Sequence, residues 1–447
     1  MRGWDAARVA DAAGARLHAS PPAGGGPQRV VIDSRAVVPG DLFVALRGAH
    51  TDGGLFVGGA LAAGAWGVLV GAGRSGQIRE TGAAVLVAED PLIALGMLAR
   101  AWRRELGARV VAITGSTGKT STKDILAAML SPALATFASP LNQNTEIGLP
   151  LAILAAPAGT EALVLELAMR APGQIAELTE ICEPDVGVIV NVGPAHLERL
   201  GSIEAIAAAK RELIEGLAAG ATAVLPAGEP LLEHLGREDL EIVRFGDGGE
   251  VSLLRAGPEG VLLALGDRRV LLEPGFRAAH LLIDLCAALA AARALGISVP
   301  DGPLDVEFSG LRGERLALPG GVVVVNDCYN ANPMSMHAAL DELATTAAGR
   351  RVAVLGEMLE LGADEEERYH RELGEQAQAA GVALLVTVGS RAAWTGESFH
   401  GGEHLHARDA AAAVALLRER LAPGDTVLVK GSRSVALERV AEGLAGR

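Results

Sequence analysis

A short apolar strand that runs into a glycine-bounded loop constrains this chain more than any other feature. Residues 110–121 read VVAITGSTGKTS, so four β-prone residues lead into Gly115 and Gly118, and a Lys-Thr pair follows. Backbone N–H groups of such a loop, with the N-terminus of the next helix, face an anion. The sequence therefore predicts a phosphate-binding strand–loop–helix unit, rather than a turn whose glycines only reverse the chain.

The loop supplies the predicted nucleotide contacts, which are Gly115, Ser116, Thr117, Gly118, Lys119, Thr120 and Ser121. A lysine in this place reaches the β- and γ-phosphates, and the following hydroxyl ligates Mg²⁺. The loop is shorter than the general G-x-x-x-x-G-K-[ST] motif, because Ile113 stands where the first glycine would be. This abbreviated form favours ATP-dependent amide ligases over motors or small GTPases.

Size and charge narrow the class of protein. With 447 residues the chain is expected to form about three domains. A net charge of −15 argues against a nucleic-acid or anionic-membrane partner, and no apolar run is long enough for a membrane span. The three cysteines are odd in number and scattered, which favours reduced thiols in the cytoplasm.

Alternating strands and helices predict an α/β fold in three segments, 1–107, 108–308 and 309–447. In the first, Asp90 and Pro91 are expected to start a helix that Gly107 ends. The second alternates buried strands with helices, as a doubly wound, mainly parallel sheet does, and adds hairpins after Gly246. The third contains four strand–helix units, which predict a Rossmann-like doubly wound domain.

Glu166 and His196 lie where carboxyl ends of strands would present ligands, and Lys210 lies on a predicted helix after Ser202. Glu166 ends the apolar run LVLE, where an unpaired carboxylate is costly to bury, so a metal ion beside the loop is one explanation and a helix cap is the other. His196 follows the strand DVGVIV and is either a second metal ligand or a structural loop residue. From spacing alone, Lys210 is a solvated helix charge above Ile214.

Two polar segments stand out in the third part of the chain. NDCYNANP (326–333) follows four valines and suits hydrogen bonds to the base or ribose of a nucleotide, with Asn332 also placed to cap the helix that opens at Pro333. VLVKGSRS (427–434) brings Lys430 and Arg433 out of a buried strand. Two cations at a strand end favour phosphate or carboxylate binding over a solvated turn.

Together these segments resemble the Mur ligases of peptidoglycan synthesis over nearly the whole chain. DSRAVVPGDLFVALRG is similar to the uridine-nucleotide segment at the N-terminus of that family, and TGSTGKTS is similar to its ATP loop. NQNTEIGLPL (142–151) is similar to its substrate-contacting segment. The resemblance therefore implies that the first domain binds a uridine nucleotide, with substrate contacts from Asp33, Ser34, Arg35, Asn142, Asn144 and Thr145.

The same resemblance assigns roles to the residues at the strand ends. It places Glu166 at the metal-binding glutamate and His196 at the family histidine. It places Lys210 at the lysine that is carbamylated in these enzymes to help hold a second Mg²⁺, which replaces the solvated-charge interpretation. The implied catalytic residues are Lys119, Glu166, His196 and Lys210, and the implied metal ligands are Thr120, Glu166, His196 and carbamylated Lys210.

NDCYNANP, LGEMLELG and VLVKGSRS look like the hallmarks of the member that adds a D-alanyl-D-alanine dipeptide. This implies a cytoplasmic, monomeric ligase that uses ATP and Mg²⁺. It would join the dipeptide to a UDP-N-acetylmuramoyl-tripeptide through an acyl phosphate. The implied ATP contacts in this part are Asp327, Tyr329 and Asn330, and the implied substrate contacts are Asn332, Lys430, Ser432 and Arg433.

The chain departs from the family pattern in places. The helix start His-Asn-x-x-Asn, which helps to recognise adenine, reads His280-Leu-Leu-Ile-Asp284, so Asp284 is expected to replace one amide. A family arginine before NDCYNANP is Arg312 or Arg315, and a shortened hairpin at residues 319–320 favours Arg315. Ala168 and Arg211 stand where glycine is more usual.

Two other functions use a similar loop. A folylpolyglutamate synthetase-like ligase shares the acyl-phosphate chemistry but lacks an equivalent of the roughly 107 residues that precede the loop here. A phosphate-loop ATPase switch would carry an apolar strand ending in aspartate, whereas the candidate strand here ends in Glu166. Its turnover would also need no amine.

Overall fold

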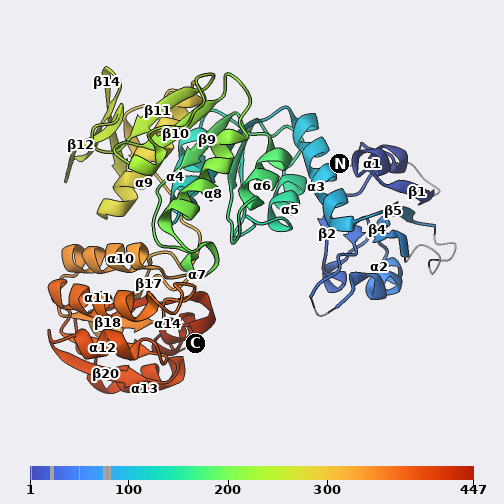
Figure 1. Cartoon of the computed structure of the whole chain (residues 1–447). Helices are drawn as coiled ribbons and strands as arrows, with labels where there is room; N and C mark the ends of the chain where they lie inside the picture. Colours follow the sequence, from blue (N-terminus) through green and yellow to red (C-terminus); the bar gives the residue numbers. More distant parts are fainter. Residues whose placement is uncertain (2, 21–24, 50, 74–77, 79–81, 447) are drawn as a thin grey trace.

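The computed structural model describes residues 1, 3–20, 25–49, 51–73, 78 and 82–446. Three sheets follow one another along the chain, and Figure 1 shows them as three lobes. The sheets lie within residues 16–88, 109–304 and 314–430. This arrangement confirms the predicted three-part α/β fold. In the described part of the chain, no helix combines the length and apolarity that a bilayer crossing requires.

The first lobe is a five-stranded sheet in the order β1-β5-β4-β3-β2, in which β1 alone pairs antiparallel. Its strands are β1 (Arg16–Ala19), β2 (Val30–Val31), β3 (Leu42–Val44), β4 (Gly67–Gly71) and β5 (Ala84–Ala88), and its helices are α1 (Ala6–Ala12), α2 (Val57–Ala62) and α3 (Pro91–Leu106). As predicted, the Asp90 side chain accepts a hydrogen bond from the Leu92 amide (2.7 Å) at the start of α3. Gly107, at φ +62°, ends that helix.

The second lobe is a ten-stranded sheet in the order β15-β14-β13-β12-β11-β10-β9-β6-β8-β7. Its strands are β6 (Arg109–Thr114), β7 (Thr136–Ala138), β8 (Ala162–Glu166), β9 (Val186–Ile189), β10 (Thr222–Pro226), β11 (Glu241–Phe245), β12 (Val251–Gly257), β13 (Gly260–Leu265), β14 (Arg268–Pro274) and β15 (Gly302–Leu304). The central strands are buried throughout, as parallel strands covered on both faces must be. The antiparallel pairs β12–β13 and β13–β14 are the predicted hairpins.

Helices cover both faces of this sheet. They are α4 (Lys119–Leu130), α5 (Gly148–Ala155), α6 (Gln174–Cys182), α7 (Leu197–Leu200), α8 (Ile203–Glu215) and α9 (Ala279–Ala294). Apolar side chains of α4 and α9 form one core with one face of the sheet, and those of α5, α6 and α8 form another core with the opposite face. Leu95, Leu98 and Trp102 of α3 belong to this second core, so the first lobe is packed against the second.

The third lobe is a six-stranded sheet in the order β16-β17-β21-β18-β19-β20, parallel except for β16. Its elements are β16 (Glu314–Leu318), β17 (Val322–Asn326), α10 (Pro333–Thr346), β18 (Arg351–Gly356), α11 (Glu366–Ala379), β19 (Leu384–Val388), α12 (Ala393–Ser398), β20 (Glu403–Ala407), α13 (Ala410–Arg420), β21 (Thr426–Lys430) and α14 (Glu438–Leu444). The four predicted parallel strands are present. Strands β16 and β20 were not predicted, because their side chains are mostly polar or exposed.

Strand register brings the predicted site segments together. Ile113 of β6 lies opposite Glu166 of β8, and Thr114 lies opposite Ile189 of β9. The phosphate loop, Glu166 and the segment after β9 therefore leave the sheet at one edge. In the third lobe Asn326 of β17 lies opposite Val429 of β21, so the two polar segments of that lobe are also neighbours. Figure 1 shows α10 along the side of the third lobe that faces the second.

Candidate active site

The phosphate loop is held by the segment that follows β9. The side-chain oxygen of Asn191 accepts hydrogen bonds from the amides of Ser116 and Thr117, both at 3.0 Å. Asn191 also donates to the Thr117 hydroxyl (3.0 Å), and the Ser116 hydroxyl donates to the Gly193 carbonyl (2.9 Å). The sequence predictions missed Asn191, although its place directly after a buried strand was a signal. Its oxygen binds two of the amides that a phosphate would bind.

Gly118 closes the loop against Asp284 of α9. Its φ of +76° favours glycine, and a Cβ built there would lie 2.3 Å from the Asp284 Oδ1. Asp284 is buried, and burial raises the pKa of its carboxyl well above the usual value, while the charge of Arg312 opposes this rise. Asp284, which stands where the family pattern has an asparagine, therefore lies directly against the phosphate loop.

Glu166 lies at the centre of a set of oxygen ligands. The Thr120 hydroxyl donates to its Oε2 (2.7 Å), and the Asn144 side chain donates to its Oε1 (2.9 Å). Glu166 is 2 % exposed, yet no lysine or arginine forms an ion pair with it among the described residues. Lys119 instead donates to the Gly115 carbonyl (2.9 Å), and its charge still interacts with Glu166. A buried carboxylate beside a hydroxyl is a ligand set that fits Mg²⁺.

Lys119, His196 and Lys210 are close enough to influence one another's charge. Burial lowers the pKa of Lys210 well below its usual value, and the charge of Lys119 lowers it further. Burial also lowers the pKa of His196, which the charges of Lys119 and Lys210 lower too, while Glu360 opposes them. The structure thus brings the four predicted catalytic residues to one place. Among the described residues, no three His, Cys, Asp or Glu side chains are grouped as a metal-binding cluster.

In the third lobe Lys430 is engaged by its own lobe. Its ammonium donates to the Asp327 carboxylate (2.7 Å), the Asp327 carbonyl (3.2 Å) and the Asn330 carbonyl (3.1 Å). Lys430 is 3 % exposed, so this cation fixes the segment after β17 to the end of β21. The predicted nucleotide contacts Asp327 and Asn330 are therefore held in place by the predicted substrate contact.

Ser432 and Arg433 have different surroundings. The Ser432 hydroxyl accepts a hydrogen bond from the Leu359 amide (3.0 Å) and is buried. Arg433 is paired with Glu438 (3.1 Å) at the surface of the lobe. Its half-exposed guanidinium is the more accessible of the two predicted cations for a ligand.

Asn332 connects two lobes. Its side-chain oxygen accepts from the Ser335 amide (2.9 Å), which makes it the predicted cap of α10. Its side-chain nitrogen donates to the Ser116 carbonyl of the phosphate loop (3.3 Å). The third lobe therefore touches the loop through the residue at which α10 begins.

Of the two arginines considered for the ATP site, Arg312 rather than the favoured Arg315 lies close enough to the phosphate loop to act on Lys119. The Arg312 guanidinium lies over the Tyr329 ring, 4.3 Å from its centroid, and its charge lowers the pKa of Lys119. Arg315 lies opposite Val325 in the β16–β17 pair and donates to the Thr346 hydroxyl at the end of α10 (2.9 Å). Of the two arginines that the sequence left open, Arg312 is therefore the one beside Tyr329 and Lys119, and Arg315 lies in β16.

The segment between β15 and β16 is fixed to α4. Asp124 accepts hydrogen bonds from the amide (2.8 Å) and the hydroxyl (3.2 Å) of Ser309, and Lys123 donates to the Ser139 carbonyl (2.8 Å). Both charged residues are largely buried and form an ion pair with each other. The connection from the second lobe to the third is therefore attached to the helix that begins at the phosphate loop.

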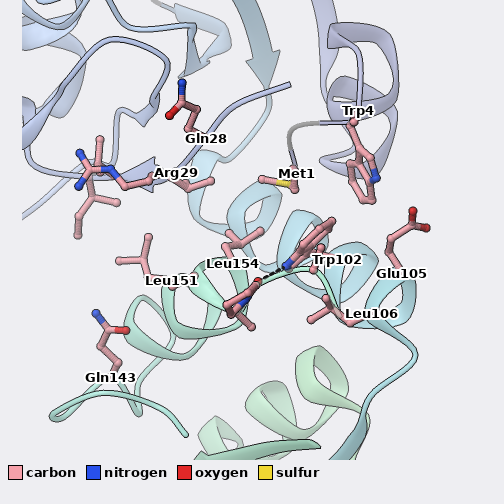
Figure 2. A pocket seen from close by; sticks show the side chains of 18 of the residues that line it. Met1, Trp4, Gln28, Arg29, Trp102, Glu105, Leu106, Gln143, Leu151 and Leu154 are labelled. Carbon is pink, nitrogen blue, oxygen red and sulfur yellow. Dashed lines mark hydrogen bonds between the residues drawn. The ribbon is translucent and has the colours of Figure 1, made fainter. Parts of the chain in front are cut away.

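A cavity of about 1040 Å³ lies between the first and second lobes (Figure 2). Its wall includes Arg29 and Asp33 from the first lobe and Gln143 and Leu154 from the second. Gln143 precedes Asn144, the residue that binds Glu166, so one wall of the cavity leads towards the phosphate loop. Figure 2 shows Gln143 on the opposite side of the cavity from Trp4.

The other predicted substrate contacts have these positions. Arg35 is paired with Asp33 (2.7 Å), and this partner lowers the pKa of Asp33 to about 2. Ser34 begins the short 3₁₀ turn that Asp33 caps. Thr145 accepts a hydrogen bond from the Gly148 amide (3.3 Å), and Asn142 is exposed.

Comparisons with known proteins agree with this arrangement. Family models match residues 28–103 (Mur ligase family, catalytic domain), 113–291 (Mur ligase middle domain) and 311–433 (Mur ligase, glutamate ligase domain). UDP-N-acetylmuramoyl-tripeptide–D-alanyl-D-alanine ligase of Bacillus subtilis is 34 % identical over 93 % of this chain and 92 % of its own.

Two solved structures are similar over almost the whole length. MurF from Acinetobacter baumannii is 28 % identical with a TM-score of 0.86, and 99 % of each chain is covered. MurF ligase from Thermotoga maritima, in complex with ADP, is 32 % identical with a TM-score of 0.81, and 94 % of this chain and 97 % of that one are covered. The similarity therefore includes all three lobes and the connections between them.

Proposed function

Because this chain belongs to the Mur ligase family, we propose that it adds D-alanyl-D-alanine to a UDP-N-acetylmuramoyl-tripeptide with consumption of ATP. The observation that carries the proposal is the grouping of half-buried Lys119 with the buried Glu166 and Lys210 beside the phosphate loop, because an amide-forming ligase must activate a carboxylate there. The relative from Bacillus subtilis and the ADP complex from Thermotoga maritima support the substrates and the nucleotide.

The proposed reaction has two steps. The terminal carboxylate of the tripeptide attacks the γ-phosphorus of ATP, so a carboxyl–phosphate bond forms and the bond to ADP breaks. The amine of the dipeptide then attacks the acyl carbon, the amide bond forms, and phosphate leaves while the amine loses a proton. Phosphoryl transfer depends on positioning and on neutralisation of charge, to which the basic groups of Lys119 and Arg312 next to the loop would contribute.

The residues near the loop divide these tasks. Lys119 would stabilise the transferring phosphoryl group, and Arg312, which carries a guanidinium beside the same loop, would assist it. Thr120 and Glu166 would hold Mg²⁺, and a bound Mg²⁺ would neutralise charge on the phosphate oxygens. We assign His196 and Lys210 to the side where the tripeptide carboxylate enters.

The chemistry of Lys210 suits a carbamate. Burial favours the neutral amine, and a neutral amine adds to carbon dioxide and releases a proton to give a carbamate anion. Lys210 would then supply two oxygens for a second Mg²⁺ at a place where the free amine supplies none. Its burial at 2 % exposure protects such an adduct from bulk water.

The remaining assignments follow the three lobes. Residues 1–107 would bind the uridine nucleotide, with contacts from Asp33, Ser34 and Arg35. Residues 108–308 would bind ATP. Residues 309–447 would complete the ATP site and bind the dipeptide near Arg433. The cavity between the first two lobes, which Asp33 and Gln143 both line, would hold the nucleotide-peptide substrate. We expect a cytoplasmic monomer.

Phosphate release tests the proposal directly. The purified chain would be given ATP and Mg²⁺, with the tripeptide nucleotide and the dipeptide omitted one at a time. Release that needs both substrates, with a pentapeptide product by mass spectrometry, is the expected result. Release without either would make the chain an ATPase and overturn the proposal. Release with other amino acids in place of the dipeptide, glutamate above all, would favour the folylpolyglutamate synthetase-like reaction.

A further inference from the structure

One turn of the third lobe reaches the second lobe at His196. Glu360, in the turn after β18, contacts His196 Nδ1 through its carboxylate. The Glu360 carbonyl accepts a hydrogen bond from the Glu198 amide (3.1 Å), and Gly362 also lies against Glu198. A single residue of the third lobe therefore binds both the side chain and the backbone at the start of α7.

Both partners have an unusual backbone conformation. His196 has a φ of +60° and Glu360 a φ of +63°, a region that residues with a Cβ rarely adopt. Such a conformation is strained and persists only where surrounding contacts determine it. Two such residues that contact each other across a lobe boundary point to a functional contact.

The turn is fixed within its own lobe. The Ser432 hydroxyl accepts from the Leu359 amide (3.0 Å), and the Ser432 amide donates to the Glu357 carbonyl (3.0 Å). On the other side, the His370 ring accepts from the Met358 amide (3.0 Å). Glu360 is therefore presented at a fixed place, and its contact with His196 depends on how the two lobes lie rather than on a mobile loop.

We propose that Glu360 is a positioning residue that joins the third lobe to the second at His196 and orients the imidazole for the reaction. Because Glu360 takes Nδ1, Nε2 is the ring nitrogen that remains for the site near Lys119 and Lys210. A carboxylate that holds one nitrogen of an imidazole fixes the ring and its tautomer. The orientation of His196 then depends on the third lobe being in place. Only the role of Glu360 in orienting His196 for the reaction rests on the proposed function, whereas the contact between the lobes does not.

Distance measurements test the joining role without any substrate. Single cysteines at Glu180 of α6 and Glu375 of α11, both exposed, would carry spin labels in the second and third lobes. The native cysteines are buried, and burial raises the pKa of each thiol to about 12, so they should not react. Labelled Glu360→Ala, Glu360→Gln and His196→Ala proteins would be compared with the labelled parent.

The proposal predicts a longer and broader distribution of distances in Glu360→Ala and His196→Ala, with no further change in the double variant. Glu360→Gln, whose amide oxygen still accepts a hydrogen bond, should stay close to the parent. His196→Ala removes the other partner of the contact and is decisive if Glu360→Ala does not fold. Glu372→Ala is the control, since this glutamate pairs with Arg368 on its own helix α11. An unchanged distribution in Glu360→Ala would overturn the proposal.

Kinetics test the orienting role. Glu360→Ala should lower kcat by roughly 10–100-fold, the usual cost of losing a partner that orients a ligand histidine. The KM for ATP should change by less than about threefold, because the phosphate loop is untouched, and Glu360→Gln should recover part of kcat. An unchanged kcat would contradict the role. If the parent protein had no ligase activity, the proposed function would fail, whereas the distance measurement would still decide the contact.

Discussion

Two lysines of this chain are equally buried, yet their surroundings are opposite. Lys430 in the third lobe is 3 % exposed and donates to a carboxylate and two carbonyls. Lys210 in the second lobe is 2 % exposed, and no carboxylate forms an ion pair with it among the residues described. Lys430 is therefore a structural cation that fixes two segments, whereas Lys210 is held as an amine whose pKa burial lowers.

The difference between the two lysines separates a buried charge that stabilises the fold from one that is left for chemistry. A charge left unpaired in the interior is costly, so proteins pair it, neutralise it or use it. The third lobe pairs its lysine, and the second lobe leaves Lys210 beside Lys119, whose charge adds to the burial that lowers the pKa of Lys210. Substitutions at the two lysines and their partners should therefore have different consequences.

Replacing Lys210 should have the largest effect. Lys210→Ala should lower phosphate release on the order of 10²–10³-fold, as loss of a group that organises transition-state charge does. If the working group is a carbamate, a short carboxylate such as acetate should restore part of the activity. Lys119→Ala is the control, because a missing cation cannot be replaced by an anion. If Lys210→Ala kept the activity of the parent and acetate had no effect on it, Lys210 would have no role in the mechanism.

Breaking the pair of Lys430 should cost stability in the third lobe. Asp327→Asn would leave a buried ammonium without its carboxylate, at a cost of about 3 kcal/mol. Hydrogen exchange should show faster exchange of the β17 and β21 amides, because Lys430 fixes the ends of both strands. Asp341→Asn, on the exposed face of α10, should change the same amides little. Equal protection in the two variants would mean that Lys430 is not structural.

Much of the site could be predicted from local sequence. The loop, the end of β8 at Glu166 and the cap at Asn332 each depend on a few adjacent residues, and parallel strands then bring their carboxyl ends together. The family resemblance supplied the role of Lys210. Its burial alone could not be predicted, because the spacing of charges around it is also typical of a solvated helix face.

Other features depend on contacts between residues far apart in the chain. The identity of the arginine beside the loop depends on the length of the β16–β17 hairpin, which no local pattern fixes. The partner of Lys430 is 103 residues away, and Glu360 is 164 residues from His196. Strand β20 contains two histidines, of which His406 is exposed, and lacks an apolar run, so only its pairing with β19 identifies it.

Arg312 is a third basic residue to compare with the two lysines, and we group it with Lys210 rather than with Lys430. Its guanidinium lies over Tyr329 near the phosphate loop, so it remains available for an anionic ligand. Arg312→Ala should lower kcat/KM for ATP by roughly 10–100-fold, which corresponds to one charge-assisted contact of about 1.5–3 kcal/mol. Arg315→Ala is the matched control, three residues away, and should change kcat/KM by less than about threefold. Equal effects of the two variants would reject this assignment.

The smallest effect is the pH dependence that the unpaired lysine imposes on stability. Burial lowers the pKa of Lys210 in the folded protein, so between that pKa and 10.5 the unfolded chain binds more protons and stability rises with pH. Lys210→Met keeps the volume and removes the amine. In carbon dioxide-free buffer at pH 7 it should therefore be more stable than the parent, by roughly 1–3 kcal/mol, the usual cost of an unsatisfied buried polar group.

This advantage should shrink as the pH rises towards 10.5, because the amine of the unfolded parent then also loses its proton. Thermal unfolding of both proteins across this range measures the difference, and added bicarbonate should stabilise only the parent if the carbamate forms. Lys430→Met should behave in the opposite way at pH 7 and destabilise the protein, since it leaves the Asp327 carboxylate without its partner. If both methionine variants were destabilised alike, Lys210 would be a paired structural lysine after all, and the contrast between the two lobes would be lost.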